Sequence, residues 1–474
     1  MSCPAPNSRL TLYNSTEILY STFFNLTVCD QSDPWRSIEK DYIINCFIVA
    51  KTLSESLKPA SVNWETLHRN YNPLLNLVRE LIGIIPNCDP TLEIWEPGFR
   101  TYNLLVPNMF NLPNTLFGSK SFKASMGLAM YASSKAACAY CTAHACSFAL
   151  RRGARAEAIA GERTPKEQAV VTLAENLAHI TSMLKPADVE AVRQYFSEAE
   201  TEWLVYSISM MGFLNKFMNA TGVELEQEAI NDTAELLSKT SWNPGVHAAN
   251  GYRITESTAP QRDNIFTYLR VIRHAPGAVL WEKKWTRDVP SNYQDGAGYL
   301  KEQTGYSFPM LKPIKESRVL KTLITVLRDN LDPKLTATGL KMKVYAGYIF
   351  SALVWNDVLK SEIKNLAAHL APELNAEMFN RLEELAQLEI PTDQEAYNKI
   401  IDSFRQQFSI TEQEAAILLL ALVTSYSPTQ INEASIETIL KLVKPAAVVE
   451  IIVWLSVLQL LNRLSSYYAL IKAY

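Results

Sequence analysis

Glycine is scarce in this sequence, with 16 among 474 residues, and no glycine-rich turn joins a predicted strand to a helix. Phosphate-binding loops need such glycines, because the backbone must approach the phosphate groups closely. The sequence therefore contains neither a Walker loop nor a dinucleotide fingerprint. We expect no nucleotide and no other cofactor.

An excess of charge of one sign is also lacking, with 45 Lys and Arg against 49 Asp and Glu. We therefore expect no nucleic-acid partner, because binding to phosphate backbones needs a basic surface. Of the most apolar runs, 415–423 is too short to cross a membrane and 446–461 is interrupted by Glu450 and Gln459. No basic leader followed by an apolar core is visible at the start. We expect no membrane contact and a cytoplasmic location.

The seven cysteines do not form a disulfide framework. The number is odd, and four of them are widely spaced at Cys3, Cys29, Cys46 and Cys88. This spacing fits a reducing compartment. The other three lie within nine residues, at Cys138, Cys141 and Cys146.

The cysteine cluster is predicted to lie on a helix, because it is rich in alanine, lacks proline and ends in Arg-Arg-Gly. At about 100° per residue, Cys138, Cys141 and His144 share a face and Cys146 does not. Cysteines three residues apart are within reach of a disulfide, and His144 could accept the Cys141 proton. The alternative is that these cysteines are apolar fillers of a buried helix.

A metal site is not expected in this cluster. Cys138, Cys141, His144 and Cys146 point over about 200° around one helix and cannot converge on a single ion. The other histidines show no pair at helical spacing with an acidic partner. We expect each to be a surface or core residue; they are His68, His179, His247, His274 and His369.

Apolar residues recur at spacings of three and four along most of the chain, which predicts an all-α fold with few or no strands. Two segments rich in Pro, Asn and Trp, 86–118 and 275–315, are predicted to be irregular connectors.

The sequence also contains an internal repeat. Residues 164–169 open a predicted helix with a Thr-x-x-Glu capping box, and residues 411–416 do the same 247 residues later. The same offset pairs 213–217 with 460–464, which share an apolar-apolar-Asn-cation-apolar pattern. We interpret this as a tandem duplication.

Further upstream, alignment of Tyr-Ala at 131–132 with Tyr-Ala at 345–346 places the thiol cluster opposite residues without thiols, so the second copy lacks the site. Cys138, Cys141 and His144 then face Ala352, Trp355 and Val358. We divide the chain into an N-terminal extension (1–40), a first unit (41–250) and a second unit (251–474) that includes the Pro/Trp-rich connector 275–315.

A helix with Cys138-x-Tyr140-Cys141 and a nearby His144, then a Thr-Pro-x-Glu helix, then a helix ending in Asn-cation, resembles the AhpD-like, carboxymuconolactone decarboxylase family. The resemblance covers 122–222 and recurs, degraded, in 340–470. It implies two tandem all-α bundles forming a pseudo-dimer, and association into homo-oligomers.

The resemblance also implies a redox centre in which Cys141 attacks the substrate, Cys138 closes the disulfide and His144 acts as base. The substrate would be a hydroperoxide or a disulfide, and an external thiol would be the reductant. The sequence departs from the family pattern at two positions: Ala145 stands where the histidine is usual, and Met126 where a relay glutamate is common.

Three functions follow from these residues. The first is a thiol-dependent peroxidase or disulfide reductase. The second is a non-catalytic oligomerisation or small-molecule-binding protein that keeps the fold, which the two departures favour. The third is a decarboxylation or isomerisation in the cavity between the units, for which the sequence offers no acid–base pair.

Overall fold

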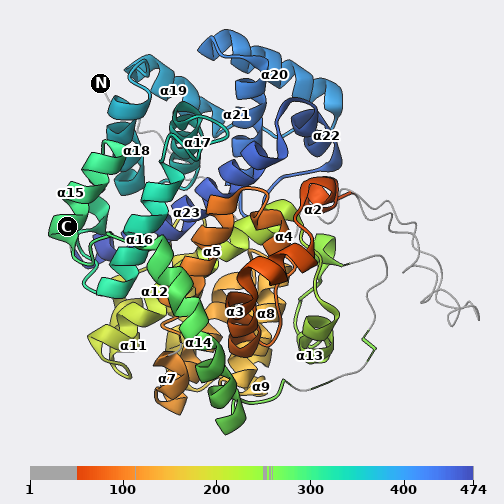
Figure 1. Cartoon of the computed structure of the whole chain (residues 1–474), viewed down its shortest axis with the longest axis vertical. Helices are drawn as coiled ribbons and strands as arrows, with labels where there is room; N and C mark the ends of the chain where they lie inside the picture. Colours follow the sequence, from red (N-terminus) through yellow and green to blue (C-terminus); the bar gives the residue numbers. More distant parts are fainter. Residues whose placement is uncertain (1–50, 113, 249–253, 256–257, 259, 473–474) are drawn as a thin grey trace, which may run out of the picture. The chain divides into compact units, whose positions relative to one another are not determined.

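The protein is entirely helical wherever its structure is described. The structure is a computed structural model (Figure 1) that describes residues 51–112, 114–248, 254–255, 258 and 260–472, and no strand occurs among them. The described residues form one compact unit. The all-α prediction is confirmed. The predicted extension, 1–40, and the junction of the two predicted units near residue 250 lie outside the described residues.

The helices fall into two successive sets along the chain. The first set comprises α2 (Leu53–Leu57), η1 (Lys58–Ala60), α3 (Trp64–Ile82), α4 (Asp89–Leu92), α5 (Glu96–Met109), α6 (Asn114–Phe117), α7 (Lys120–Ser134), α8 (Ala139–Arg151), α9 (Ala156–Ala160), α10 (Pro165–Ala178), α11 (Pro186–Arg193), α12 (Glu198–Thr221), α13 (Gln227–Leu237) and η2 (Gly245–His247). The second set comprises α14 (Ile265–Trp285), α15 (Tyr293–Thr304), η3 (Pro309–Leu311), α16 (Ser317–Asn330), α17 (Leu340–Leu353), α18 (Asp357–Leu370), α19 (Ala376–Leu385), α20 (Gln394–Phe408), α21 (Glu412–Ser425), α22 (Glu433–Leu442) and α23 (Pro445–Leu470).

Both predicted capping boxes are present. Thr164 N–H donates to Glu167 Oε2 at 2.8 Å, and Glu167 N–H donates to Thr164 Oγ1 at 3.3 Å. Thr411 and Glu414 repeat these contacts at 2.9 and 3.2 Å. Each box satisfies two amides that have no acceptor within the helix, which fixes where α10 and α21 begin.

The two segments predicted to be irregular connectors contain helices. Segment 86–118 holds α4, α5 and α6, and segment 275–315 holds most of α14, α15 and η3. Proline misled the prediction: Pro97 lies in the first turn of α5, where no amide is needed, and Pro276 lies inside α14. Helix α14 passes so close to α3 that a Cβ on Gly277 would lie 2.4 Å from Pro73 Cβ, so tertiary packing supports the proline-containing helix.

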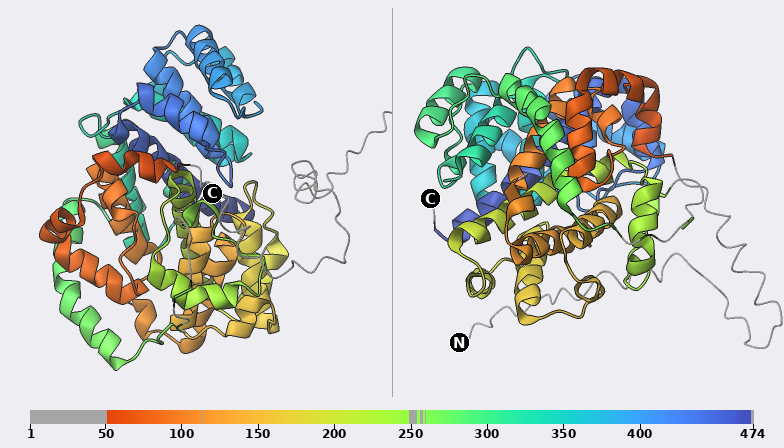
Figure 2. Two further views of the ribbon diagram at one scale, coloured as in Figure 1. Left: turned by 90° about the vertical axis from the view of Figure 1, so that its right-hand side faces the viewer. Right: turned by 60° about the horizontal axis from the view of Figure 1, so that its bottom comes forward.

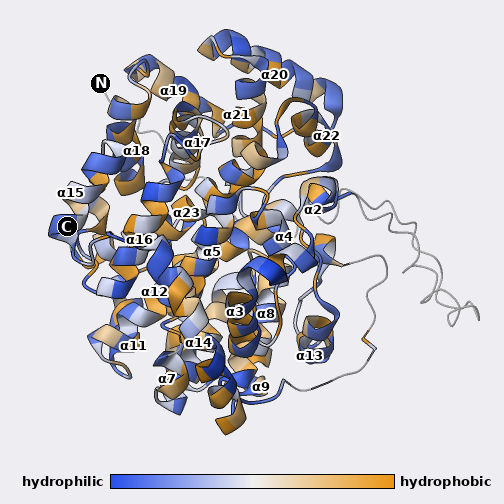
Figure 3. Ribbon diagram, viewed as in Figure 1, coloured by the Kyte–Doolittle hydropathy of each residue, from blue (hydrophilic) through white to orange (hydrophobic). Residues whose placement is uncertain are grey.

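The core is built around α12 and α23, the two longest helices, which pack against each other. Helices of the first set, red to green, pack beside those of the second, green to blue (Figure 2). By length and composition α23 could cross a membrane, and the bent pair α20 and α21 passes the same test together. The tested stretch of α23 is 89% buried inside the structure, as expected for an apolar core helix (Figure 3).

Two buried cations cross between the helix sets at this core. Lys216 on α12 donates to the carbonyls of Thr424 at 3.0 Å and Ser425 at 2.9 Å, at the end of α21, and also contacts the Tyr426 carbonyl. Arg463 on α23 donates to the carbonyl of Ala178, the last residue of α10, at 3.5 Å. The last carbonyls of a helix have no partner within it, so each cation satisfies helix-end acceptors in the opposite set.

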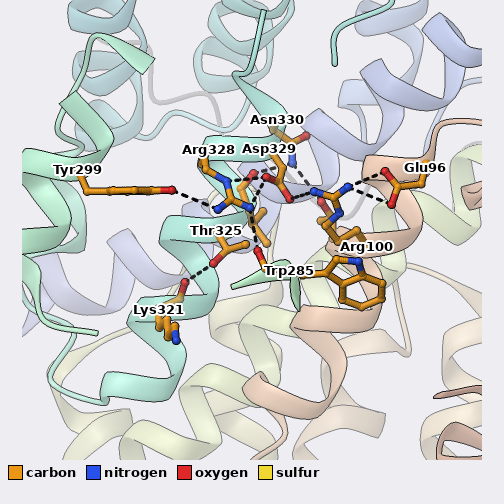
Figure 4. A network of polar contacts seen from close by, with 11 residues as sticks. Glu96, Arg100, Trp285, Tyr299, Lys321, Thr325, Arg328, Asp329 and Asn330 are labelled. Carbon is orange, nitrogen blue, oxygen red and sulfur yellow. Dashed lines mark hydrogen bonds and ion pairs between the residues drawn. The ribbon is translucent and has the colours of Figure 1, made fainter. Parts of the chain in front are cut away.

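Polar contacts join α5 to α16 at both of their ends, and Figure 4 shows the network around Arg100 and Asp329. Arg100, near the start of α5, lies 3.0 Å from Asp329, near the end of α16. Arg318, near the start of α16, donates to Asn108 Oδ1 near the end of α5. The two helices therefore exchange equivalent contacts, each from its first turns to the last turns of the other.

Candidate functional site

Cys138 lies at the start of a helix rather than within it. It is the N-cap of α8, and the Cys141 N–H donates to its sulfur with 3.4 Å between N and Sγ. The prediction that both cysteines lie on successive turns of one helix is therefore wrong for Cys138, which precedes the first turn, whereas Cys141 lies within that turn. A helix N-terminus favours negative charge, so the N-cap is a better place for a thiolate than the helix interior.

His247 supplies the histidine contact of Cys138. Its Nε2 lies 3.9 Å from Cys138 Sγ, and its Nδ1–H donates to the Val223 carbonyl at 2.6 Å, which orients the ring toward the sulfur. Burial alone would raise the pKa of Cys138, but hydrogen bonds from Cys141 and His247 lower it to about 5. Burial would lower the pKa of His247, and the contact with Cys138 raises it instead. The contact therefore favours the thiolate form of Cys138 and the protonated form of His247.

Cys141 has the opposite electrostatic setting. Burial, followed by hydrogen bonding to Cys138 and the negative charge of Cys138, raises the pKa of Cys141 well above its ordinary value. The charge of Arg463 opposes this shift only in part. The shift favours the protonated form of Cys141. Cys138 and Cys141 are each 3% exposed.

His144, predicted to accept the Cys141 proton, is held by a carboxylate instead. Its Nε2 lies 2.8 Å from Glu226 Oε2, and its ring stacks on Tyr140 with 4.3 Å between centroids. Tyr140 O–H and Asn87 N–H donate to the other oxygen of Glu226, at 2.7 and 2.6 Å. Burial would raise the pKa of Glu226, but His144 and these donors lower it, so the carboxylate is ionised.

The two residues that depart from the pattern of the resembled family, Met126 and Ala145, are both buried in the apolar core. Ala145 is 1% exposed and Met126 is fully buried. The acidic group near His144 comes from Glu226, at the N-cap of α13, and the histidine near Cys138 comes from η2. His247 and Glu226 were missed because they lie 109 and 82 residues from their partners, with no local pattern to connect them.

A small cavity adjoins the second thiol. It has a volume of about 50 Å³, and the polar side chains in its lining are Tyr102, Tyr140, Cys141 and His144. Apolar side chains line the rest: Ile82, Pro86, Val106, Phe110, Met130, Ala145, Phe148, Met211, Leu214 and Met218. A water needs about 10–15 Å³ of such space, so the cavity admits a molecule of a few heavy atoms.

Other buried groups surround the site without joining the thiol pair. Asp89 is fully buried and neither carboxyl oxygen has a hydrogen-bond partner, and burial, then the charge of Glu226, raises its pKa well above the ordinary range. Burial raises the pKa of Cys88 strongly and that of Cys146 to about 12, so both are inert thiols. Within the described part of the chain, no group of three or more ligand side chains could hold a metal ion.

Comparison with known proteins gives no relative: no family model, no curated protein and no solved structure matches this chain.

Proposed function

We propose that this protein is a thiol-dependent oxidoreductase, a peroxidase or disulfide reductase, that uses Cys138 and Cys141 as its redox pair. The observation that carries the proposal is the contact between Cys138 Sγ and His247 Nε2 at the start of α8, with a second thiol one turn away. A thiolate is the nucleophilic form of cysteine, and a neighbouring imidazolium stabilises it.

The proposal exchanges the roles inferred from the family resemblance. Cys138 is the nucleophile, because its pKa is lowered to about 5, and Cys141 closes the disulfide, because its pKa is raised. His247, rather than His144, is the base of the nucleophile. Local geometry supports the exchange, since only Cys138 receives the helix N-terminal amide.

In the peroxidase reaction, the Cys138 thiolate attacks one oxygen of a hydroperoxide. The S–O bond forms, the O–O bond breaks, and the alcohol leaves with a proton from the His247 imidazolium. Cys141 sulfur then attacks the sulfenic sulfur, so the S–S bond forms and hydroxide leaves with the Cys141 proton as water. An external dithiol returns two electrons and two protons to restore both thiols.

Glu226 and His144 supply the proton relay in this proposal. His144 lines the cavity beside Cys141, and Glu226 contacts His144. Tyr140 donates a hydrogen bond to Glu226, and its ring stacks on His144. A carboxylate that orients a histidine is the usual arrangement for moving a proton to or from a reacting group. This pair takes the place of the family's relay, whose residues are absent at 126 and 145.

We further propose that the chain is a tandem duplication of an AhpD-like bundle folded as a pseudo-dimer. Lys216 and Arg463 occupy equivalent positions of the 247-residue repeat, and each donates to the end of the helix that opens with a capping box in the opposite set. Arg100 and Arg318 make a second exchanged pair of contacts between α5 and α16. Reciprocal contacts of this kind are the mark of a twofold interface.

The second unit keeps the helix start but not the chemistry. Asn356 is the N-cap of α18, and its side chain accepts from Leu359 N–H at 3.0 Å, as Cys138 accepts from Cys141 N–H in α8. Under this proposal the counterparts of the two thiols are Asn356 and Leu359, rather than Ala352 and Trp355. An asparagine caps a helix but carries no redox chemistry.

Burial of both thiols favours the alternative, a non-catalytic small-molecule-binding or oligomerisation protein. Cys138 and Cys141 are each 3% exposed, and reactive thiols are usually partly accessible. The redox proposal includes a cytoplasmic location, an external thiol reductant and a homo-oligomeric state. If the redox proposal is wrong, these three expectations lose their support.

Counting free thiols after exposure to hydroperoxide tests the proposal. The wild type and a Cys146→Ser control should lose two thiols together, and Cys138→Ser should keep the Cys141 thiol. Cys141→Ser should stop at a Cys138 sulfenic acid, which a dimedone adduct would reveal. Thiol counts that do not change in the wild type would favour the binding protein.

A further inference from the structure

Helix α14 carries an apolar face that is turned to solvent. Its strongly exposed apolar residues are Ile265 (63%), Phe266 (65%), Leu269 (56%), Ile272 (58%), Val279 (43%) and Leu280 (68%). We call these six residues the α14 face. Single exposed apolar residues are ordinary on a protein surface, but a continuous row along one helix marks an interaction site.

The geometry of the helix shows that this face is distinct from the one that packs on the protein. At about 100° per residue, Ile265, Leu269, Ile272, Val279 and Leu280 fall within an arc of about 100°. The buried residues of α14 lie on the opposite side of the helix; they are Thr267, Val271, Ala278 and Trp285. The helix is therefore apolar on two opposite faces, and only one of them has a partner within the described structure.

Helix α3, which packs against α14, provides a contrast. Its exposed positions are polar or aromatic and include Glu65, Arg69, Asn72 and Arg79. Two adjacent helices of similar length therefore present very different surfaces. The apolar exposure of α14 is a property of that helix and not of this side of the protein.

Positive charge accompanies the α14 face. Residues 265–287 contain one carboxylate, Glu282, and five cations: Arg270, Arg273, Lys283, Lys284 and Arg287. All five cations are exposed, although the chain as a whole has a net charge of −4. Arg270 is paired with Glu80 at 2.6 Å, so the positive charge of the face comes from the other four. Like charges would oppose the pairing of this face with the same face of a second copy, whereas an anionic surface would attract it.

Aromatic side chains border the face. Phe117, 60% exposed, lies 5.3 Å from the ring of Tyr268, and Trp281 is half-buried beneath the cation of Lys284 at 4.4 Å. Aromatic rings and lysines are the residues that settle at the boundary between lipid headgroups and acyl chains.

From these observations we infer that the α14 face binds the surface of an anionic lipid membrane, with α14 lying in the plane of the interface. Exposed Phe, Ile and Leu side chains enter the boundary of the acyl chains, and Arg273, Lys283, Lys284 and Arg287 contact the lipid phosphates and carboxylates. The expectation of no membrane contact rested on the lack of a spanning segment, and a helix that lies on the surface needs none. This inference does not depend on the redox chemistry of Cys138.

Flotation of the full-length protein with vesicles tests the inference. We expect the wild type to float with vesicles of phosphatidylcholine and phosphatidylserine, and to remain behind with phosphatidylcholine alone or at high salt. The apolar variant Leu269→Gln/Ile272→Gln/Leu280→Gln should lose binding, and Lys283→Glu/Lys284→Glu should reduce the bound-to-free ratio by about tenfold or more.

Two matched controls keep the test specific. Trp355→Gln changes a side chain that is 72% exposed outside the face, and Lys399→Glu reverses a charge on α20. Both should float like the wild type. All the substituted side chains are exposed, so circular dichroism should show an unchanged fold.

The inference would be overturned if the wild type did not float with anionic vesicles. It would also be overturned if both α14 variants floated like the wild type, or if neither control variant floated. A wild type that does not float and is a dimer in analytical ultracentrifugation, made monomeric by the apolar variant, would identify a second copy as the occupant of the face.

Discussion

Lys216 and Arg463 are buried close to each other at the contact of α12 and α23, and each donates to carbonyls at the end of a helix in the opposite set. Burial, and then the charge of Arg463, lower the pKa of Lys216 to about 7. Two cations in a dry core are costly unless hydrogen bonds satisfy them. Lys216 uses helix-end carbonyls, whereas Arg463 donates to the Ile208 carbonyl inside α12 at 2.6 Å as well as to the end of α10, and its Nε has no partner among the described residues.

We predict that Lys216→Met destabilises the protein by about 3 kcal/mol, because it leaves buried carbonyls at the end of α21 without a donor. Urea unfolding followed by circular dichroism would measure the change. The exposed Lys399→Met is the matched control and should shift the free energy of unfolding by about 0.5 kcal/mol or less. A loss below about 1 kcal/mol in Lys216→Met would show that the contacts with α21 contribute little.

The ionisation of Cys138 should follow pH in a defined direction. The folded-state pKa of about 5 lies below the ordinary value of 9.0, so the thiolate forms as pH rises through about 5. Its stabilising contact with His247 is lost as pH falls through that value. Ultraviolet absorbance of the thiolate requires no access to the sulfur and would report the midpoint.

His247→Gln should raise that midpoint, because the hydrogen bond and charge of the imidazolium are two of the causes that lower the pKa of Cys138. Cys138→Ser should remove the transition, and Cys146→Ser should leave it in place. A midpoint that is the same in His247→Gln and the wild type would show that His247 does not stabilise the thiolate.

Glu226→Gln should slow the hydroperoxide-dependent loss of the thiol pair by about two orders of magnitude, because a neutral amide cannot stabilise a charged His144. The amide oxygen still accepts from Asn87 and Tyr140, so the fold should persist. Stopped-flow measurement of thiol loss gives the rate, and the thiolate absorbance of Cys138 tests whether the nucleophile is intact. An unchanged rate would assign Glu226 a structural role only.

Filling the cavity should separate binding of the substrate from ionisation of the thiol. Ala145→Leu places extra carbons against the space beside Cys141 and His144, at a stability cost of about 1–3 kcal/mol. We expect a slower reaction with an organic hydroperoxide than with hydrogen peroxide, and an unchanged titration of Cys138. Equal slowing of both oxidants would show that the cavity does not admit the substrate.

The local part of the structure was predictable from the sequence, because caps and helix periodicity depend on neighbouring residues. The capping boxes at Thr164 and Thr411 and the glycine that follows α8, Gly153 with φ of +94°, are present as predicted. Helix α14, which contains Pro276, and helix α5, which has Pro97 in its first turn, were not recognised, since their stability comes from packing against distant helices.

The site was predictable only as far as it is local. Cys138 and Cys141 lie close together, as their spacing implied, but the helix begins at Ala139 and leaves Cys138 at the N-cap, whereas the alanine-rich pattern predicted a helix that contains Cys138. His247 and Glu226 reach the thiol region through the packing of α8 on η2 and α13, which no spacing in the sequence reveals. The chemical roles changed because the partners of each side chain come from the tertiary fold.

The exchange of helix-end donors between the two sets of helices has a consequence for stoichiometry. One set carries the thiols, and both sets depend on the buried cation of the other. If the two sets of helices were separate chains, they would have to associate in solution and would dissociate on dilution. Because one covalent chain holds both sets, the thiol-bearing set has its partner set at every protein concentration.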